Sequence, residues 1–264
     1  MNPVVARHLK GAIASTIGAA VGLTRKPPKR FIIFTNGRTG SNLLVSLLRD
    51  HTDFRVHSEV FGEYQIDLPG IRALIDRKGP VDYLRSCFRR MTVEDFVGIK
   101  MLYYNIEEEY GLKRGVAGLS ALRGEILNDP DLYFIHLKRE NHVDRLLSNA
   151  LARASGQFLN GAYLEEQIEV DLEWAKSELH RMQEWEYEFD RALPAERTFD
   201  VTYEALVSDK ATVMSKLFAF MGAKPMAVNS SMKKQSKRPH SERISNYGEL
   251  KAQFSGTEFA SMFD

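Results

Sequence analysis

Residues 30–50 read RFIIFTNGRTGSNLLVSLLRD, and this stretch decides the fold. The apolar run from Arg30 to Thr35 predicts a buried strand, and residues 41–50 predict a helix that begins near Ser41. The glycine-containing segment between them predicts a tight turn. A turn of this kind brings the free N–H groups at the start of a helix to the end of a strand, where they can bind an anion.

The rest of the chain alternates between strands and helices in the same way. Further apolar runs predict strands at Phe96 to Leu102, Leu132 to Leu137 and Arg197 to Tyr203. Helices are expected at about residues 141–154, 168–193 and 210–221. Strands that are separated by helices pair in parallel, so the sequence predicts an α/β fold: a single-domain parallel-sheet sandwich flanked by helices.

The N-terminal part of the chain differs in charge from the rest. Residues 1–29 form a basic arm before the domain at 30–264, and no acidic residue precedes Asp50. The uncharged stretch between Lys10 and Arg25 is shorter than the roughly 20 apolar residues that span a bilayer. Two expectations remain open: peripheral contact of residues 1–30 with an anionic membrane, or a loosely packed arm.

The composition excludes several classes of protein. A chain of 264 residues with 44% hydrophobic content can fill a core, which excludes wholesale disorder. A net charge of +1 gives no case for a nucleic-acid partner, and the composition gives no indication of an oligomeric state. Cys87 is the only cysteine, so an intrachain disulfide is impossible, and no metal-ligand cluster is visible. A reducing, cytoplasmic location fits best.

The turn after the first strand suits a phosphate group. Gly37 and Gly40 let the backbone approach an anion, and the N–H groups of Gly40, Ser41 and Asn42 open the helix. Arg38 adds a positive charge. The turn lacks the Gly-Lys-Ser/Thr end of the nucleotide-binding P-loop, so no lysine is placed for a γ-phosphate and no hydroxyl for Mg²⁺.

A second basic turn, HLKRENH at 136–142, follows the strand at 132–137 and leads into the helix that carries Ser148. Positions nine apart lie on opposite faces of a helix. Arg139 and Ser148 therefore converge only if Arg139 lies in the turn before the helix. The alternative is that Arg139 pairs with Glu140 or Asp144 on a solvated face.

Together these segments resemble sulfotransferases that use 3′-phosphoadenosine-5′-phosphosulfate (PAPS). FTNGRTGSNLL (34–44) looks like the family's 5′-phosphosulfate loop, and LKRENHVDRLLS (137–148) looks like its 3′-phosphate element. VTYEALVSD (201–209) resembles the family's Tyr-Glu-x-Leu segment, and RISNYGEL (243–250) resembles its closing element. The resemblance implies a P-loop-like nucleotide-binding fold and transfer of the sulfuryl group of PAPS to an acceptor hydroxyl without a metal.

The resemblance also implies roles for single residues. Arg38 is expected at the bridging oxygen and 5′-phosphate. The other residues expected to bind the co-substrate are Thr39, Gly40, Ser41 and Asn42 in the loop, Arg139 and Ser148 at the 3′-phosphate, Tyr203 at the adenine edge, and Lys237 and Arg238 in a closing segment. Tyr203 can equally be a core tyrosine, and the closing segment can equally be a solvated loop.

A base must accept the proton of the acceptor hydroxyl, and two residues compete for this role. In the trehalose-type enzymes a glutamate in a similar Glu-x-Phe context is the proposed base, which favours Glu59. His57 is the alternative, because a neutral imidazole suits pH 7, whereas glutamate has an ordinary pKa of about 4.3. His57 can instead end a strand, and Glu59 can pair with Arg55. Lys100 stands where relatives often have a lysine. It can contact the acceptor or the sulfate, or it can equally form an ordinary ion pair.

The spacing of nine between Arg139 and Ser148 is similar to that in bacterial trehalose-type and Nod-factor-type carbohydrate sulfotransferases. This similarity implies a sugar or glycolipid acceptor. Asn36 stands where the family commonly has proline, and Asn42 where it commonly has threonine. These differences affect the assignment to a branch of the family more than the expected use of PAPS. Two other functions stay open: an Mg²⁺-dependent P-loop-type kinase, and a non-catalytic, membrane-associated nucleotide-binding protein.

Overall fold

A parallel sheet forms the centre of the computed structural model, which describes residues 26–89, 93–158, 166–232 and 238–263. Its strands are β1 (Lys29–Thr35), β2 (Phe54–His57), β3 (Phe96–Leu102), β4 (Leu132–Lys138) and β5 (Thr198–Thr202). They lie in the order β2-β3-β1-β4-β5, and every neighbouring pair is parallel. The predicted parallel α/β architecture is therefore confirmed. β2 was not predicted, because its four residues FRVH are too short to show a clear period.

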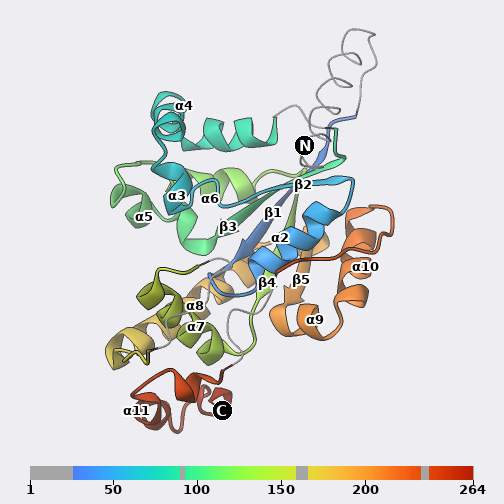
Figure 1. Ribbon diagram of the computed structural model, residues 1–264. Coiled ribbons are helices and arrows are strands. Elements are labelled where there is room, and N and C mark those ends of the chain that lie inside the picture. The colour runs from blue at the N-terminus through green and yellow to red at the C-terminus, as the bar shows by residue number, and fades with distance from the viewer. Residues whose placement is uncertain (1–25, 90–92, 159–165, 233–237, 264) are drawn as a thin grey trace.

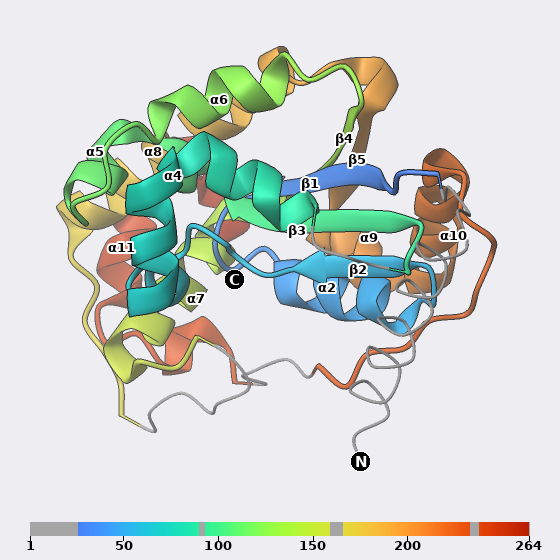
Figure 2. The ribbon, with the colours of Figure 1, turned by 90° about the horizontal axis from the view of Figure 1, so that it is seen from above.

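Helices cover both faces of the sheet (Figures 1 and 2). The face that carries Phe31 and Ile33 packs against α2 (Ser41–Asp50), α9 (Tyr203–Ser208) and α10 (Lys210–Met221). The face that carries Ile32 and Phe34 packs mainly against α4 (Pro69–Phe88), α6 (Ser120–Leu127) and α8 (Leu172–Ala192). The remaining helices are α3 (Glu63–Ile66), α5 (Glu108–Leu112), α7 (His142–Ser155) and α11 (Tyr247–Gln253).

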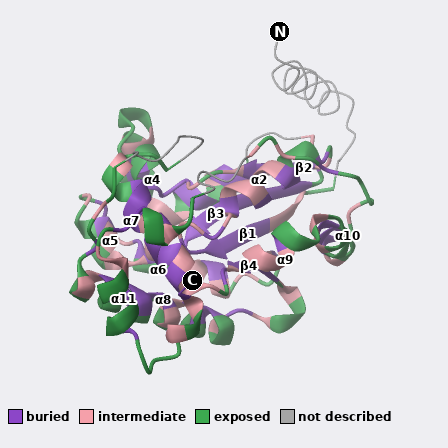
Figure 3. Ribbon diagram, turned by 60° about the horizontal axis from the view of Figure 1, so that its bottom comes forward, coloured by how far each residue is buried: buried purple, intermediate pink, exposed green. Residues whose placement is uncertain are grey.

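Burial on both faces explains the uninterrupted apolar run of β1. Its four central residues, at positions 31–34, are fully buried, as the burial colouring of the sheet shows (Figure 3). Gly98 lies opposite Phe31 in the β1–β3 register, and a Cβ added at Gly98 would lie 2.1 Å from the Phe31 ring. The core therefore requires glycine at this position of β3, because the ring occupies the space of a side chain.

Two helices differ from the sequence prediction. The long helix was expected from about residue 168, but α8 begins at Leu172, because the Asp171 carboxylate accepts a 2.6 Å hydrogen bond from the Trp174 amide and caps the helix there. α4 was not predicted, because Gly79 and Pro80 interrupt its pattern. Gly79 has a φ of 77°, which kinks the helix at that point.

The basic arm lies mostly outside the described residues, which begin at position 26. The predicted membrane contact of residues 1–30 therefore stays a prediction, as does the boundary between an arm at 1–29 and a domain at 30–264. None of the helices in the described ranges has the length and apolar character needed to cross a membrane.

Candidate functional site

The two basic turns leave the sheet at the same edge. β1 and β4 are neighbours in the sheet, and Thr35 pairs with Leu137 at their carboxyl ends. The Thr35 hydroxyl also donates a 2.7 Å hydrogen bond to the Leu137 carbonyl, which ties the two strand ends together. In open parallel sheets this edge is where ligands bind. The two turns therefore meet at one edge of the sheet.

The loop between β1 and α2 has an unusual backbone. Arg38 has a φ of 67° and is the only non-glycine residue with a positive φ in the part of the chain that the structure describes. Gly40 has a φ of 78°, and a Cβ added there would lie 2.4 Å from the Tyr203 ring. Gly37 has no positive φ, and an added Cβ there would meet nothing within 4 Å. The loop therefore requires glycine at position 40 rather than at position 37.

The side chains of the loop point in different directions. The buried Thr39 hydroxyl donates a 2.9 Å hydrogen bond to the Asn36 carbonyl, so this side chain serves the loop itself. Ser41 is buried at the first position of α2, and Asn42 accepts a 2.8 Å hydrogen bond from Lys100. The N–H groups at the start of α2 are consequently the part of this segment best suited to an anion.

The predicted 3′-phosphate residues meet the loop. Arg139 lies between β4 and α7, as predicted, and its Nη1 donates a 2.9 Å hydrogen bond to the Arg38 carbonyl. The Arg38 Nε donates to the Ser148 Oγ at 3.1 Å. The guanidinium of Arg139 also lies 4.6 Å from the centroid of the Tyr203 ring. Arg38, Arg139, Ser148 and Tyr203 thus form one cluster, with the Arg38 side chain directed at the 3′-phosphate element rather than at the start of α2.

Asp144 connects this cluster to the C-terminal part of the chain. Its two carboxylate oxygens contact Arg139 and His240 respectively. The pairing of Arg139 with Asp144 was foreseen as an alternative on a solvated face, but Arg139 is only 7% exposed, so the pair lies inside the site. Arg238 is exposed and lies 3.3 Å from Glu242, whereas Lys237 lies outside the described residues.

The two candidate bases lie in different surroundings. The Glu59 Oε1 is 2.7 Å from the Lys100 Nζ, which in turn donates to Asn42 at the start of α2. Lys100 is only 4% exposed, so a buried ammonium joins Glu59 to the phosphate loop. His57 is the last residue of β2 and pairs with Ile99 in the sheet. Glu59 is therefore connected to the loop through Lys100.

Aromatic side chains lie near Glu59. The rings of Tyr104 and Tyr110 are 5.0 Å apart, and the Trp185 ring lies 6.3 Å from that of Tyr104. Burial, with a smaller contribution from the charge of Glu59, raises the pKa of Tyr104 and raises the pKa of Tyr110 to about 12. The Tyr110 hydroxyl donates a 2.9 Å hydrogen bond to the Phe61 carbonyl, two residues after Glu59, which places this aromatic group beside the segment that carries the candidate base.

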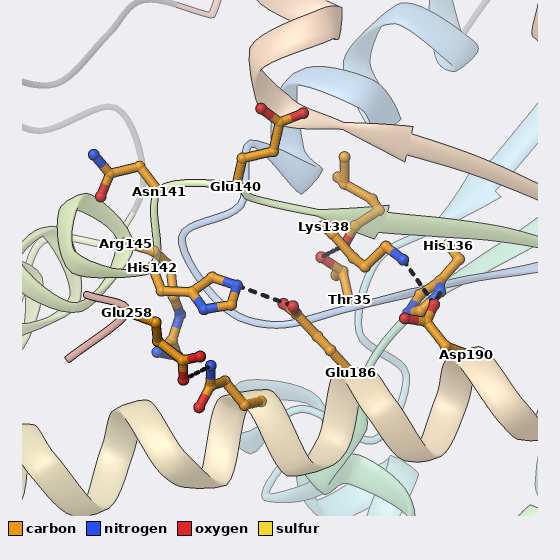
Figure 4. Close-up of polar contacts among 12 residues, drawn as sticks. Thr35, His136, Lys138, Glu140, Asn141, His142, Arg145, Glu186, Asp190 and Glu258 are labelled. Atoms are coloured by element: carbon orange, nitrogen blue, oxygen red, sulfur yellow. Dashed lines mark hydrogen bonds and ion pairs between the residues drawn. The ribbon is translucent and has the colours of Figure 1, made fainter. Parts of the chain in front are cut away.

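One group of side chains has metal-ligand chemistry. Within the described ranges, His136, Asp190 and Asp200 bring their ligand atoms within 4.8 Å of one another. The Lys138 ammonium lies 2.7 Å from Asp190, and Figure 4 shows this contact beside that of His142 with Glu186. Because the Lys138 ammonium offsets part of the carboxylate charge, the group is a partly exposed ion cluster rather than a good cation site.

Sequence reasoning missed one residue that contacts the phosphate loop. Arg145 of α7 donates a 2.9 Å hydrogen bond from its Nε to the Gly37 carbonyl. Its position held a usable signal, because Arg145 precedes Ser148 by three residues and positions three apart lie on the same face of a helix. The buried ion pair between Arg145 and Glu178 had no signal in the sequence, since 33 residues separate the partners.

Comparisons with known proteins agree with this geometry. The family model described as "Sulfotransferase family" matches residues 126–226. Nodulation protein H of Rhizobium meliloti is 22% identical over 249 residues, with 90% of this chain and 96% of the relative covered. These matches support a sulfotransferase family for the chain. A second relative of the same name, from Rhizobium meliloti strain 1021, gives this sulfotransferase the same identity and coverage.

The fold of this sulfotransferase has a counterpart among solved structures. The sulfotransferase domain from the curacin biosynthetic pathway matches it with a TM-score of 0.52 and 18% identity, covering 91% of this chain and 90% of that domain. The predicted P-loop-like nucleotide-binding fold is confirmed. The match to the sulfotransferase family model indicates a transferase, and hence an enzyme.

Proposed function

We propose that this sulfotransferase moves the sulfuryl group of PAPS to a hydroxyl group of a carbohydrate or glycolipid. The observation that carries the proposal is the meeting of Arg38, Arg139 and Ser148 at the carboxyl ends of β1 and β4. These side chains lie next to the N-terminus of α2, so two sets of anion-binding groups adjoin each other. A nucleotide with phosphate groups at both the 5′ and 3′ positions fits such a pair.

The residues present suit this co-substrate in charge and in shape. Arg139 offers a guanidinium in a largely buried position, where a charge-assisted hydrogen bond to a phosphate is stronger than in water. The Tyr203 ring lies against both Arg139 and Gly40 and offers an apolar surface for a nucleobase. Arg38 reaches from the 5′-phosphosulfate loop to Ser148, so we assign it to both phosphate groups.

The chain's residues can support in-line transfer. The acceptor oxygen forms a bond to sulfur as the bond from sulfur to the bridging phosphate oxygen breaks, and the acceptor proton passes to a carboxylate. We assign the proton to Glu59, which the Lys100 ammonium holds at 2.7 Å. The negative charge that develops on the leaving phosphate is stabilised by Arg38 and by the N–H groups at the start of α2. His57 is the second candidate for the base.

Support for a sugar-type acceptor comes from the surroundings of Glu59. Tyr104, Tyr110 and Trp185 offer aromatic faces beside the proposed base. Sugar rings present C–H groups that pack on such faces, and binding sites commonly combine aromatic walls with a few polar groups. The sequence resemblance to the bacterial carbohydrate sulfotransferases points to the same class of acceptor. We further propose a cytoplasmic location, with the basic arm in contact with an anionic membrane.

Thermal shift measurements test the co-substrate. Adenosine 3′,5′-bisphosphate (PAP) should stabilise the protein without added metal and more strongly than ADP does, and Arg139→Ala should remove most of this shift. Arg153→Ala is the matched control, because Arg153 is an exposed arginine on α7. Equal shifts with PAP and ADP would contradict the 3′-phosphate assignment, and a shift only with ATP and Mg²⁺ would favour a kinase.

A transfer assay tests the acceptor. The protein is incubated with radiolabelled PAPS and a panel of sugars, glycolipids and phenols, and sulfated products are separated. Label should appear in the sugars or glycolipids. Label in the phenols alone would contradict the proposed acceptor class, and PAP binding without label in any product would favour a non-catalytic nucleotide-binding protein.

A further inference from the structure

Arg145 connects the phosphate loop to a buried carboxylate. Its Nε donates to the Gly37 carbonyl at 2.9 Å, and its two terminal nitrogens donate to one oxygen of Glu178 at 3.1 and 3.0 Å. Arg145 and Glu178 are each only 4% exposed. The second oxygen of Glu178 contacts Arg181. Figure 4 shows Arg145 reaching from α7 toward α8 beneath His142. Arg145 belongs to none of the groups assigned to the co-substrate.

The two arginines of this region hold consecutive carbonyl groups of the loop. Arg145 binds the Gly37 carbonyl, and Arg139 binds the Arg38 carbonyl, each at 2.9 Å. In a trans peptide unit the carbonyl oxygen and the following N–H point in opposite directions. Fixing the Gly37 carbonyl therefore fixes the N–H of Arg38, and fixing the Arg38 carbonyl fixes the N–H of Thr39. Both N–H groups are directed away from the arginines that hold the loop.

Stability alone does not account for this arrangement. A buried ion pair loses hydration on both partners, and such pairs are often no more stabilising than apolar residues of the same size. Burial lowers the pKa of Arg145 to about 10, because the charged guanidinium loses its hydration. The loop conformation is costly as well, because Arg38 has a φ of 67°. A contact that fixes the neighbouring carbonyl keeps the loop in this conformation.

We propose that Arg145, held in place by Glu178, is a positioning residue that fixes the phosphate loop with its N–H groups directed at the 5′-phosphosulfate of the co-substrate. The proposal rests on the proposed use of PAPS. Arg145 would change the affinity for the co-substrate without touching it, because the hydrogen bonds of its side chain go to Gly37 and Glu178.

Calorimetric titration with PAP tests this role in a matched pair of variants. Arg145→Lys keeps the positive charge, but one ammonium cannot serve both the Gly37 carbonyl and Glu178 in the same geometry. Arg197→Lys is the control, because Arg197 donates to the carbonyls of Asp129 and Leu132 before and at the start of β4, away from the loop. We expect Arg145→Lys to weaken PAP binding about 10- to 100-fold, and Arg197→Lys to stay within about twofold of the wild type.

A second readout reports on the loop itself. Hydrogen exchange of the amides of residues 38–41, measured without nucleotide, should be faster in Arg145→Lys and unchanged in Arg197→Lys. A merely structural role would lower the melting temperature of both variants and leave PAP affinity and loop exchange unchanged. Wild-type PAP affinity in Arg145→Lys, or an equal loss in both variants, overturns the proposal.

Glu178→Gln keeps the test decisive if Arg145→Lys does not fold. This variant retains Arg145 and removes the charge that holds it, so PAP binding should weaken by a smaller factor, with the same faster exchange of the loop. Wild-type affinity and exchange in Glu178→Gln would overturn the proposal. If the wild-type protein itself does not bind PAP, the proposed function fails. Faster exchange of the loop amides in the variants would still show, in that case, that Arg145 positions the loop.

Discussion

The two halves of the site are held by different kinds of contact. On the co-substrate side, the backbone of the phosphate loop is itself held by side chains: Arg145 and Arg139 bind the carbonyls of Gly37 and Arg38, and these arginines also pair with Glu178 and Asp144. Around the proposed base, side chains bind one another, as in the pairs of Glu59 with Lys100 and of Arg114 with Glu63. The helices on that side also expose apolar side chains, among them Tyr64, which is 78% exposed, and Leu112, which is 60% exposed.

The difference indicates how one half can change while the other stays constant. A contact to a backbone carbonyl survives substitution of the residue that supplies the carbonyl. A contact between two side chains is lost when either one is replaced. Substitutions around α3 and α5 can therefore alter the acceptor while the co-substrate loop keeps its shape, which fits the general observation that specificity lies in variable surface segments.

The largest effect is expected from Glu59→Gln, which should separate chemistry from co-substrate binding. Loss of the proposed base should lower the rate of sulfate transfer by about 10²- to 10⁴-fold. PAP affinity should stay near that of the wild type, because Glu59 belongs to the acceptor half. Single-turnover transfer and calorimetric PAP titration measure the two quantities. His57→Gln is the comparison, and a mild effect of Glu59→Gln beside loss of activity in His57→Gln would reverse the assignment of the base.

A smaller effect is expected from Gly40→Ala, which should lower PAP affinity because it changes the co-substrate half. The φ of 78° at Gly40 disfavours any other residue, and the new Cβ would lie 2.4 Å from the Tyr203 ring. PAP affinity should fall about 10- to 30-fold, as the cost of a left-handed conformation and the displaced ring suggest. Gly37→Ala in the same loop should bind PAP normally, since nothing lies within 4 Å of its added Cβ. Equal affinities in the two variants would contradict the description of the loop.

Gly62→Ala should disturb the acceptor half with a milder outcome. Gly62 has a φ of −69°, which alanine adopts readily, but its Cβ would lie 2.7 Å from the Cβ of Glu59. The displaced carboxylate should lower the transfer rate about 5- to 10-fold and leave PAP affinity unchanged. Gly70→Ala is the control, because its added Cβ meets nothing within 4 Å. Steady-state kinetics that are normal in both variants would show that the position of Glu59 does not limit the reaction.

The smallest effect is expected outside both halves, at Asp200 of β5. A hydrogen bond from His136 holds the pKa of Asp200 below its ordinary value. The stability gained in this way is present above the ordinary pKa of about 3.9 and is lost as the pH falls through the lowered value. Asp200→Asn should therefore lower the free energy of unfolding at pH 6 by less than about 1 kcal/mol.

Denaturant titrations at pH 6 and at pH 3.5 measure this difference. The gap between the wild type and Asp200→Asn should narrow at the lower pH, while PAP affinity at pH 7 should be the same in both proteins. A gap that widens toward low pH would contradict the pKa shift. A change in PAP affinity would show that the ion cluster around His136 influences the co-substrate half.

Much of the fold could be predicted because its elements carry local signals. The bounds predicted for β3, α2 and α10 agree with the structure. α10 shows why, because Asp209 caps its first turn and Gly222 ends it with a φ of 74°. β2 and the kinked α4 were missed, because four residues and an interrupted pattern give no clear period.

The site could be predicted only where a motif is continuous in the sequence. Arg139 and Ser148 occur in one segment, and their meeting with Arg38 followed from the rule that parallel strands present their carboxyl ends at one edge. The contact of Glu59 with Lys100 joins β3 to the segment after β2, and no local pattern encodes it. The hold of Arg145 on Gly37 spans 108 residues and depends on the packing of α7 against α8.

The long reach of that last contact bears on the order in which a newly made chain can become active. Gly37 is synthesised before the carboxylate that holds its arginine, which lies 141 residues later at position 178. Contacts between distant segments form late, because a long stretch of chain must be ordered first. A nascent chain that has not yet released α8 from the ribosome therefore lacks the finished loop. On the positioning role proposed for Arg145, nucleotide binding would follow completion of α8, and a product truncated before α8 would not compete for the co-substrate.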